Sequence, residues 1–359
     1  MILDPILDLF RSKAVTIPPL DGAFRPNTEL DDAPLLARLA DADNLVVRGG
    51  ELLASSGNAL YRLDAGGAEP LASFPAAVTA LAVAPDGALA IALDNGTLLI
   101  DGEEQPLPAG VRCLTALAFA ANGELWLANG SAERSPADWA TDLMLHGASG
   151  SLWKRPPGAA RFTQVAGDLA FPYGLLPVGE GGIVFTESWR HRLVRLDASG
   201  RRVIADKLPG YPARLAPAQD GGAWLALFAP RNRLIEFVLR EQHYRLDMLA
   251  QVPRAFWIAP ALSSGRSFLE PLQCGGIKTM GVHKPWAPSR SYGLLVRLDA
   301  ALRPTASLHS RADGQRHGTC SAVEHAGRLL VASRGGDCII DAGPLSSPSR
   351  RASALEVHG

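Results

Sequence analysis

Short runs of apolar residues recur along the chain, and a turn that contains glycine separates each run from the next. The first copies of this pattern read NLVVRGGELLASSGNALYRLD from Asn44 and ALAVAPDGALAIALDNGTLLID from Ala80. Further copies start at Ala116, Gly174, Arg214 and Ser321. Apolar runs of about four to eight residues between such turns are typical of β-strands. The sequence therefore predicts six copies of one small β-unit.

The turns indicate how these strands pair. Asp86-Gly87 and Asn122-Gly123 stand between consecutive apolar runs, and Gly, Asn and Asp tolerate the positive φ that tight hairpins need. Each unit is then an antiparallel meander whose apolar faces need covering. Because packing the six meanders around one axis covers those faces, we predict an all-β fold, a six-bladed β-propeller. Turns this short exclude a doubly wound α/β fold, which needs a helix between parallel strands.

The spacing between the copies is uneven, and the extra length predicts insertions into a single propeller domain of residues 1–359. A lead of residues 1–42 precedes the first copy, and a polar loop is inserted at 130–150. A longer insertion at about 238–291 begins with VLREQHYRLDMLAQV, a run of helix formers that Pro253 ends. We predict that this insertion forms a helical cap over one mouth of the propeller.

The cap segment leaves a second interpretation open. Arginines flank the apolar residues that follow the helical run, and such a segment could instead lie against a membrane surface. The residues concerned are Arg240, Arg245, Arg254, Phe256, Trp257 and Ile258.

Charge and composition narrow the range of partners. The chain has 35 basic and 36 acidic side chains, a net charge of −1, whereas proteins that bind nucleic-acid backbones carry a basic surplus. No apolar run reaches the ~18 residues that a transmembrane helix needs. Asp4 and Asp8 interrupt the apolar N-terminal stretch, so it lacks the uncharged core of a secretory signal. We expect a cytoplasmic protein that binds a small-molecule substrate and no nucleic acid.

Several longer motifs stand out within the copies. FPYGLLPVGEGGIVFTESWRHRLVRLD starts at Phe171 and is followed by LPGYPARL, and the last copy lies within HGTCSAVEHAGRLLVAS, which starts at His317. These motifs resemble the strictosidine synthase-like family, whose opening is also similar to IPPLDGAFRPNTELDDA from Ile17. The resemblance implies a six-bladed propeller related to paraoxonases and to the senescence-marker/gluconolactonase lactonases. It implies no single reaction, because the group includes amine–aldehyde condensation as well as lactone and ester hydrolysis.

Residues at the start of each innermost strand are expected to point into one mouth of the central channel, and Asn129, at the end of a second strand, is expected to reach it too. By alignment of the copies, the first set is Asp43, Asn44, Thr79, Thr115, Tyr173, Arg214 and Cys320.

The family resemblance implies a calcium ion at this mouth, held by the oxygen ligands that a hard cation requires. Asp43, Asn44 and Asn129 match ligand positions. However, Tyr173 stands where the family has Asn, and Arg214 stands where it has part of an Asp-Asn pair. We therefore favour no metal or other cofactor, with Ca²⁺ on Asp43, Asn44 and Asn129 as the less favoured alternative.

The same exchange predicts catalytic roles. The Arg214 guanidinium would supply the positive charge that calcium otherwise brings and would bind a carboxylate, a phosphate or an oxyanion. Asp43 would be its ion-pair partner or a general base, and Tyr173 a hydrogen-bond donor. The alternative is that Arg214 is locked to Asp43 and only fills the channel. Cys320, where strictosidine synthase has a glutamate, is either a nucleophile beside His317 or a buried core cysteine.

Further candidates lie around the predicted mouth. Glu187 is either a base or the partner of Arg190 or Arg192. His146, in the inserted loop, would lie over the mouth as an acid or base, or else be an exposed loop histidine. Trp257 and Trp286, in the cap segment, are expected to form an apolar roof.

These residues together predict an enzyme that acts on small molecules. The favoured reaction is calcium-independent hydrolysis or lyase chemistry on an ester, a lactone or a related carbonyl compound at the channel mouth. Two alternatives stay open. One is condensation of an amine with an aldehyde, and the other is a propeller that binds a small molecule without catalysis.

Overall fold

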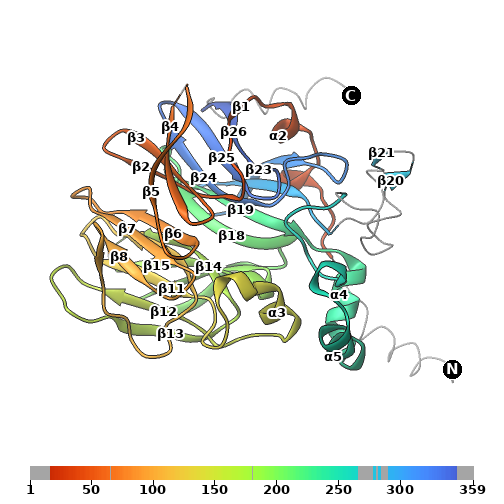
Figure 1. The fold of residues 1–359 in the computed structure, drawn as a ribbon, viewed down its shortest axis with the longest axis horizontal. Coiled ribbons are helices and arrows are strands. Elements are labelled where there is room, and N and C mark those ends of the chain that lie inside the picture. Colours follow the sequence, from red (N-terminus) through yellow and green to blue (C-terminus); the bar gives the residue numbers. More distant parts are fainter. Residues whose placement is uncertain are drawn as a thin grey trace.

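The computed structural model describes residues 17–64, 66–179, 181–265, 278–279, 282–283 and 290–345. Within these residues the strands form six four-stranded antiparallel sheets that surround a common axis (Figure 1). A separate two-stranded pair, β20 (Lys278–Thr279) and β21 (Val282–His283), lies outside the ring. The predicted all-β, six-bladed propeller is confirmed.

Each blade runs from an innermost strand outward, in chain order for the first five blades. Blade one consists of β2 (Ala42–Arg48), β3 (Glu51–Ser56), β4 (Ala59–Asp64) and β5 (Gly67–Ser73). Blade two consists of β6 (Val78–Val83), β7 (Leu89–Leu93), β8 (Leu98–Ile100) and β9 (Glu103–Glu104). Blade three consists of β10 (Leu114–Phe119), β11 (Leu125–Asn129), β12 (Gly150–Arg155) and β13 (Thr163–Leu169). Blade four consists of β14 (Pro172–Val178), β15 (Gly182–Glu187), β16 (Arg192–Asp197) and β17 (Gly200–Ala205). Blade five consists of β18 (Gly210–Pro217), β19 (Ala223–Pro230), β22 (Gly293–Leu298) and β23 (Pro304–Ser310).

Blade six joins the two ends of the chain. Its inner strands are β24 (Thr319–His325), β25 (Arg328–Ser333) and β26 (Cys338–Pro344), and its outer strand is β1 (Leu35–Arg38) from the beginning of the chain. The β1 residues Leu35 and Ala37 stand opposite Ile340 and Ile339 of β26. This pairing closes the ring with backbone hydrogen bonds, so the blades cannot separate without breaking a sheet.

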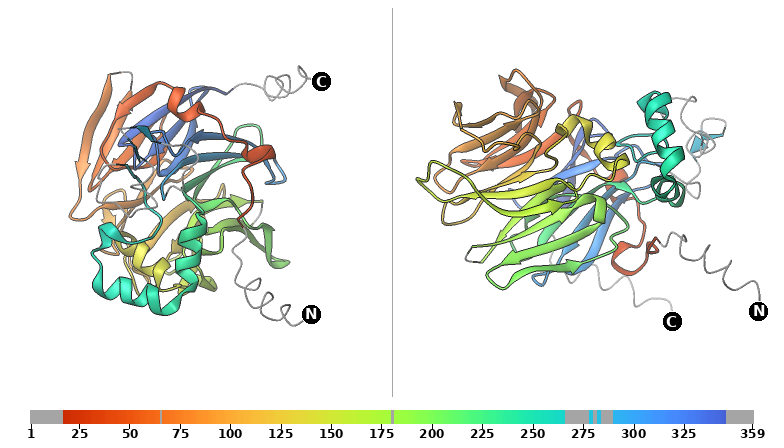
Figure 2. Two further views of the ribbon diagram at one scale, coloured as in Figure 1. Left: turned by 90° about the vertical axis from the view of Figure 1, so that its right-hand side faces the viewer. Right: turned by 90° about the horizontal axis from the view of Figure 1, so that it is seen from below.

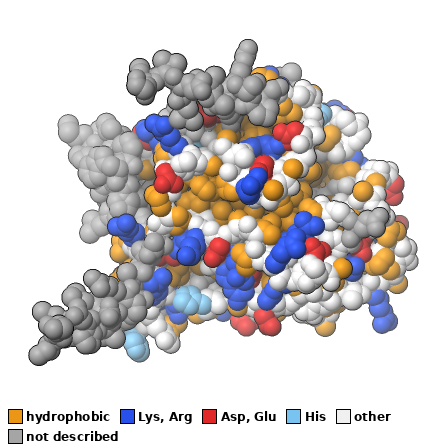
Figure 3. Space-filling view, turned by 180° about the vertical axis from the view of Figure 1, so that it is seen from behind, with side chains coloured by type: hydrophobic (Ala, Val, Ile, Leu, Met, Phe, Trp, Pro, Cys, Tyr) orange, Lys and Arg blue, Asp and Glu red, His pale blue; other side chains and the backbone are white. Residues whose placement is uncertain are grey.

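The core lies between neighbouring blades, where the apolar faces of the meanders meet. Trp126 and Phe185, at 2% and 0% exposed, belong to one such layer between blades three and four. The turns follow the sequence prediction: Gly87 takes a φ of +91°, and the carboxylate of Asp86 accepts a hydrogen bond from the Ala88 amide at 3.0 Å. Figure 3 shows apolar side chains gathered between Lys and Arg side chains on the face turned away from the viewer of Figure 1.

Helices are few and gather in the insertions. η2 (Pro136–Asp138) and α3 (Trp139–Met144) lie between β11 and β12. α4 (Arg233–Arg240), α5 (Gln242–Gln251) and η4 (Arg254–Phe256) lie between β19 and β22, and α5 contacts α3 on the same side of the propeller (Figure 2).

Local sequence explains these helices. Asn232 caps α4, with its side chain accepting a hydrogen bond from the Leu234 amide at 2.8 Å. Ile235 and Val238 anchor α4 to the core. The remaining short helices are η1 (Gly22–Phe24), α2 (Glu29–Asp32) and η3 (Ser188–Arg190). In the described part of the chain, none of the helices has the length and apolarity needed to cross a membrane.

Candidate functional site

A cavity of about 260 Å³ opens at one mouth of the central channel. Its floor comes from the beginnings of the innermost strands and from the residues just after second strands, and its walls come from the two insertions. The polar and charged residues in its lining are Asp41, Asp43, Thr79, Asp94, Thr115, Tyr173, Arg214, Arg254 and Arg334. Of the residues predicted at this mouth, the structure brings Asp43, Thr79, Thr115, Tyr173 and Arg214 into one cavity.

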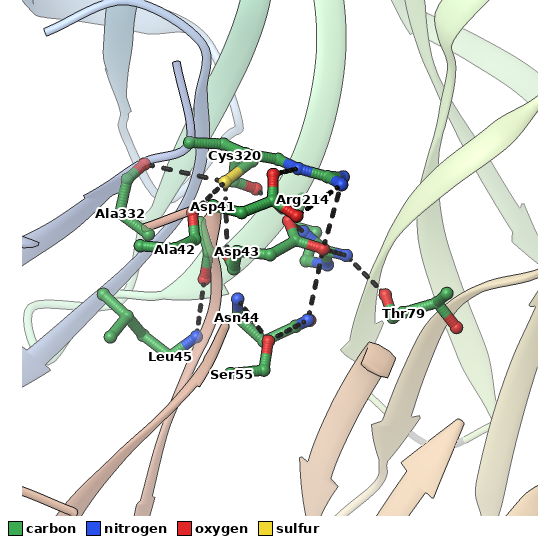
Figure 4. Close-up of polar contacts among 12 residues, drawn as sticks. Asp41, Ala42, Asp43, Asn44, Leu45, Ser55, Thr79, Arg214, Cys320 and Ala332 are labelled. Atoms are coloured by element: carbon green, nitrogen blue, oxygen red, sulfur yellow. Dashed lines mark hydrogen bonds and ion pairs between the residues drawn. The ribbon is translucent and has the colours of Figure 1, made fainter. Parts of the chain in front are cut away.

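Arg214 and Asp43 form a two-pronged ion pair at the floor of this cavity (Figure 4). Arg214 Nη1 donates to Asp43 Oδ1 at 2.7 Å, and Nη2 donates to Oδ2 at 3.2 Å. Nη2 also donates to the backbone carbonyl of Thr79 at 2.5 Å. The guanidinium carbon lies 4.9 Å from the centre of the Tyr173 ring. The side chains of Arg214 and Asp43 are only 11% and 7% exposed, so this pair is buried in the channel and also forms part of the cavity wall.

A second arginine, Arg334, extends the pair into a cluster. Its Nε donates to Asp41 Oδ1 at 2.6 Å, and its Nη1 lies 3.9 Å from Asp43 Oδ2. The Asp43 carboxylate thus lies between two guanidinium groups. Neither Asp41 nor Arg334 is among the residues predicted from the sequence to lie at this mouth.

Strand register explains why Arg334 was missed and where Asn129 and Glu187 lie. In blades one, two and six, the residue that follows the second strand lines the cavity, whereas the last residue of that strand does not. Gly57, Asp94 and Arg334 are such following residues, and all three line the cavity. Asn129 was chosen as the last residue of its second strand, whereas Arg334 stands one position later in its own blade, directly after β25.

Asn129 and Glu187 accordingly serve the framework rather than the cavity wall. Asn129 Oδ1 accepts hydrogen bonds from the amides of Arg112 and Cys113 at 3.1 and 2.9 Å. Glu187 is fully buried, and its carboxylate accepts hydrogen bonds from Arg190 and Arg192, both at 2.6 Å. Glu187 is therefore the partner of both Arg190 and Arg192 in this structure, and its carboxylate is not free to act as a base.

Burial and charge together set the protonation states. Burial disfavours the ionised form of Asp43, but the positive charges of Arg214 and Arg334 outweigh it and hold the pKa of this carboxyl below its usual range. Burial and the nearby Asp43 charge raise the pKa of the Tyr173 phenol well above its ordinary value. For Arg214, burial favours the neutral form, but Asp43 more than compensates and the pKa is raised. At neutral pH the floor therefore holds a carboxylate, two guanidinium cations and a neutral phenol.

Two threonines at equivalent positions of β6 and β10 differ in their hydrogen bonding. Thr115 Oγ1 lies 2.5 Å from the carbonyl oxygen of Pro172, to which it donates. Within the described part of the chain, the buried Thr79 Oγ1 has no hydrogen-bond partner. A hydroxyl in a cavity wall that the protein itself does not satisfy is available to a ligand.

Aromatic residues form the walls, but they are not the ones predicted. Trp139 from α3 meets Phe228 from β19 edge-on with ring centres 5.3 Å apart, and Phe171 meets Tyr173 at 5.9 Å. Trp257 is buried elsewhere, with its indole nitrogen donating to the Val252 carbonyl at 2.8 Å, and is absent from the cavity lining. The expectation of a Trp257 roof is therefore corrected.

The two remaining roof and rim candidates do not line the cavity as described. Trp286 lies outside the described residues. His146 follows α3 and contacts the Arg245 guanidinium, 2.5 Å away, instead of lining the cavity. Burial and the Arg245 charge lower the pKa of this imidazole.

The calcium alternative can be tested on the three residues named for it. Both oxygens of Asp43 accept hydrogen bonds from Arg214, Asn129 Oδ1 accepts two backbone amides, and the Asn44 amide group donates to Ser55 Oγ at 2.9 Å. A divalent ion on Asp43 would also meet the Arg214 charge. The residues present do not fit a calcium cage, which needs roughly six to eight oxygens. Among the described residues there is also no group of three or more His, Cys, Asp or Glu side chains that could hold a metal.

Cys320 lies beneath the floor rather than in the cavity lining. Its thiol donates to the backbone carbonyl of Asp43 at 3.1 Å and is fully buried (Figure 4). Burial, reinforced by the Asp43 charge, raises the pKa of this thiol well above its ordinary value. The His317 ring bonds to Ser291 and to the Arg311 carbonyl instead. This geometry gives no support to a nucleophilic Cys320.

Comparison with known proteins gives a fold. No protein-family model matches the chain, and no curated protein matches it in sequence. A solved gluconolactonase from Xanthomonas campestris is similar with a TM-score of 0.52 and 15% identity, over 86% of this chain and 89% of that chain. A second solved structure, of a protein named as a candidate gluconolactonase, has a TM-score of 0.52 and 12% identity, over 84% and 89%. At these identities the likeness shows the six-bladed propeller architecture.

Proposed function

We propose that this protein is a small-molecule hydrolase that cleaves an ester or lactone in the axial cavity without a metal ion. The observation that carries the proposal is the floor of that cavity, where a buried guanidinium, Arg214, stands beside an unsatisfied hydroxyl, Thr79. The likeness to solved gluconolactonases, which share this architecture, supports the same reaction class.

The charges of the lining favour a neutral substrate. Asp41, Asp43 and Asp94 offset Arg214, Arg254 and Arg334. A carboxylate or phosphate ligand would have to compete with Asp43 for guanidinium hydrogen bonds, whereas a neutral carbonyl adds no charge to this balance. Aromatic walls and a few convergent polar groups are the usual composition of such a pocket.

Each floor residue has a role that follows from its protonation state. Thr79 Oγ1 donates to the carbonyl oxygen, and the Arg214 cation stabilises the negative charge that develops there. Asp43 holds Arg214 in place through its hydrogen bonds. Asp43 is not assigned as the base, because a carboxylate whose pKa is held low is a weak base. We assign Asp41, whose side chain is 49% exposed and accepts hydrogen bonds from Arg334 at 2.6 and 3.1 Å, to take a proton from the attacking water. It returns this proton to the leaving alcohol oxygen as the C–O bond breaks. Tyr173, kept neutral, covers the flat face of Arg214.

The test is hydrolysis of a panel of lactones and aryl esters, with and without a chelator. We expect turnover that survives the chelator. Thr79→Val, which keeps the side-chain shape, should lower kcat/KM by about tenfold, the value of one lost hydrogen bond. It should not lower stability, because its hydroxyl has no partner within the described protein.

Thr115→Val is the matched variant, because it removes a hydroxyl that the protein itself uses. We expect Thr115→Val to lower the free energy of unfolding, because it removes this hydrogen bond. The size of that loss shows what a satisfied hydroxyl contributes to stability, for comparison with Thr79→Val. A chelator that abolishes turnover would overturn the metal-free part of the proposal. Ligand binding without any turnover across the panel would favour a propeller that binds a small molecule without catalysis. In that case the Arg214–Asp43 pair would serve only to fill the channel.

A further inference from the structure

Three side chains outside the axial cavity form a continuous hydrogen-bonded chain. Ser264 Oγ lies 2.5 Å from Ser291 Oγ, and Ser291 Oγ lies 2.8 Å from His317 Nδ1. His317 Nε2 lies 2.6 Å from the carbonyl oxygen of Arg311. Ser291 and His317 are buried, at 0% and 3% exposed, whereas Ser264 is half-buried.

The direction of each hydrogen bond follows from valence. The Arg311 carbonyl can only accept, so His317 Nε2 carries a hydrogen, and in the neutral imidazole form that a base requires Nδ1 is the acceptor. Ser291 must therefore donate its one hydroxyl hydrogen to Nδ1. Ser264 is left to donate its hydrogen to Ser291 Oγ. The chain is thus a proton path from the Ser264 hydroxyl to an imidazole base.

The outer end of this path faces a second cavity, of about 450 Å³. Ser264 and His317 are among its described lining residues, none of which also lines the axial cavity. Arg38 and Arg316 line the same cavity, and the carboxylate of Asp313 lies 3.1 Å from the Arg311 guanidinium. The wall therefore carries positive charge from Arg38 and from Arg316, whose guanidinium is held by the backbone carbonyls of Leu30 and Ala33.

Close backbone packing fixes Ser264 in this position. A Cβ atom on Gly335 would lie 1.8 Å from the carbonyl oxygen of Leu262, so only glycine lets the backbone of residue 262 approach blade six. Gly265, directly after the serine, takes a φ of +76° and turns the chain. Leu262, two residues before Ser264, is thereby packed closely against Gly335 of blade six.

We propose that Ser264 is an activated serine nucleophile that forms a covalent acyl-enzyme with esters in the second cavity. Its Oγ attacks the acyl carbon, and its proton passes to Ser291 while the proton of Ser291 passes to His317 Nδ1. The ester C–O bond breaks, and the alcohol leaves with a proton that returns from His317 through Ser291. Water then attacks the acyl carbon along the same path, releasing the acid and restoring the Ser264 hydroxyl.

The test uses the full-length protein and diisopropyl fluorophosphate as the probe. A Ser264 Oγ–P bond would form, the P–F bond would break, and the proton would pass to His317 as fluoride leaves. Intact mass should show one diisopropyl-phosphoryl adduct, and peptide mapping should place it on Ser264. No adduct, or an adduct on another residue, overturns the proposal.

Two serine variants separate activation from mere exposure. Ser291→Ala should slow labelling about 100-fold or more, since a positioned base contributes that much. Ser73→Ala, which alters an exposed serine that lines neither cavity, should label at the wild-type rate. Equal rates in Ser291→Ala and wild type, with unchanged circular dichroism, would show that the chain is only structural. Labelling that persists in Thr79→Val shows that this site is independent of the axial cavity.

Discussion

Replacing Arg214 with methionine should destabilise the protein more than any surface charge substitution. The change keeps most of the side-chain volume but leaves the buried Asp43 carboxylate without its closest partner. Removing one member of a buried ion pair costs about 3–5 kcal/mol. Arg334 remains 3.9 Å from Asp43 and offsets part of that loss, so we expect a cost of about 3 kcal/mol, at the lower end of this range.

The cost should also depend on pH in a direction that the Asp43 environment fixes. In the wild type the pKa of Asp43 lies below its ordinary 3.8, so the stabilisation is present above that pH and is lost as pH falls below it. In Arg214→Met, burial acts with less opposition and should raise this pKa. The variant then regains stability as the carboxyl takes up a proton. The difference between the two proteins should therefore shrink as pH falls from 7 toward 4.

Urea unfolding followed by tryptophan fluorescence measures this difference, with the m-value checked for constancy. Arg303→Met is the control, because the side chain of Arg303 is 76% exposed in its ion pair with Asp299 and should cost less than about 1 kcal/mol. The double variant Arg214→Met/Asp43→Asn should lose less than the sum of the two single variants. A cost equal to that of the control, or one that does not change with pH, would show that Asp43 does not depend on Arg214 for its charge.

Three further predictions test the framework and the protonation states. Leu30→Ala should cost about 2–5 kcal/mol in urea unfolding, because Leu30 is fully buried, whereas Leu20→Ala, 36% exposed, should cost far less. Cys320 should resist iodoacetamide in the native protein and react only after unfolding, since burial raises the pKa of its thiol; native-state alkylation mapped to Cys320 would contradict this. Glu236 is buried, but hydrogen bonds and charge from neighbouring His191 and Arg231 outweigh burial and lower its pKa to about 2. Its contribution to the free energy of unfolding is therefore present above pH 4.5 and lost as pH falls toward 2. In urea unfolding at a series of pH values, Glu236→Gln should therefore show a smaller change of this free energy between pH 4.5 and 2 than the wild type.

The sequence alone could predict the repeated strands, because they are local features. A strand of alternating or continuous apolar residues ending at Asp86-Gly87 needs no distant information to form a hairpin. Six such units leave apolar faces that only mutual packing covers, and this requirement leads to the propeller. The alignment of the copies predicted Asp43, Thr79 and Tyr173 at one mouth, and these three line one cavity. Asn44 and Cys320, which were aligned with them, are absent from its lining.

The contents of the site were decided by the tertiary structure. Asp43 and Arg214 are 171 residues apart, so no local pattern could show that they would pair and not point apart. Asn129 and Arg334 differ in role by a single step of strand register, which reverses the side of the sheet that a side chain faces. The aromatic walls come from Trp139 and Phe228, which different loops and strands bring together. Sequence specifies faces and turns through short-range sterics and burial, whereas a cavity depends on which distant faces close around it.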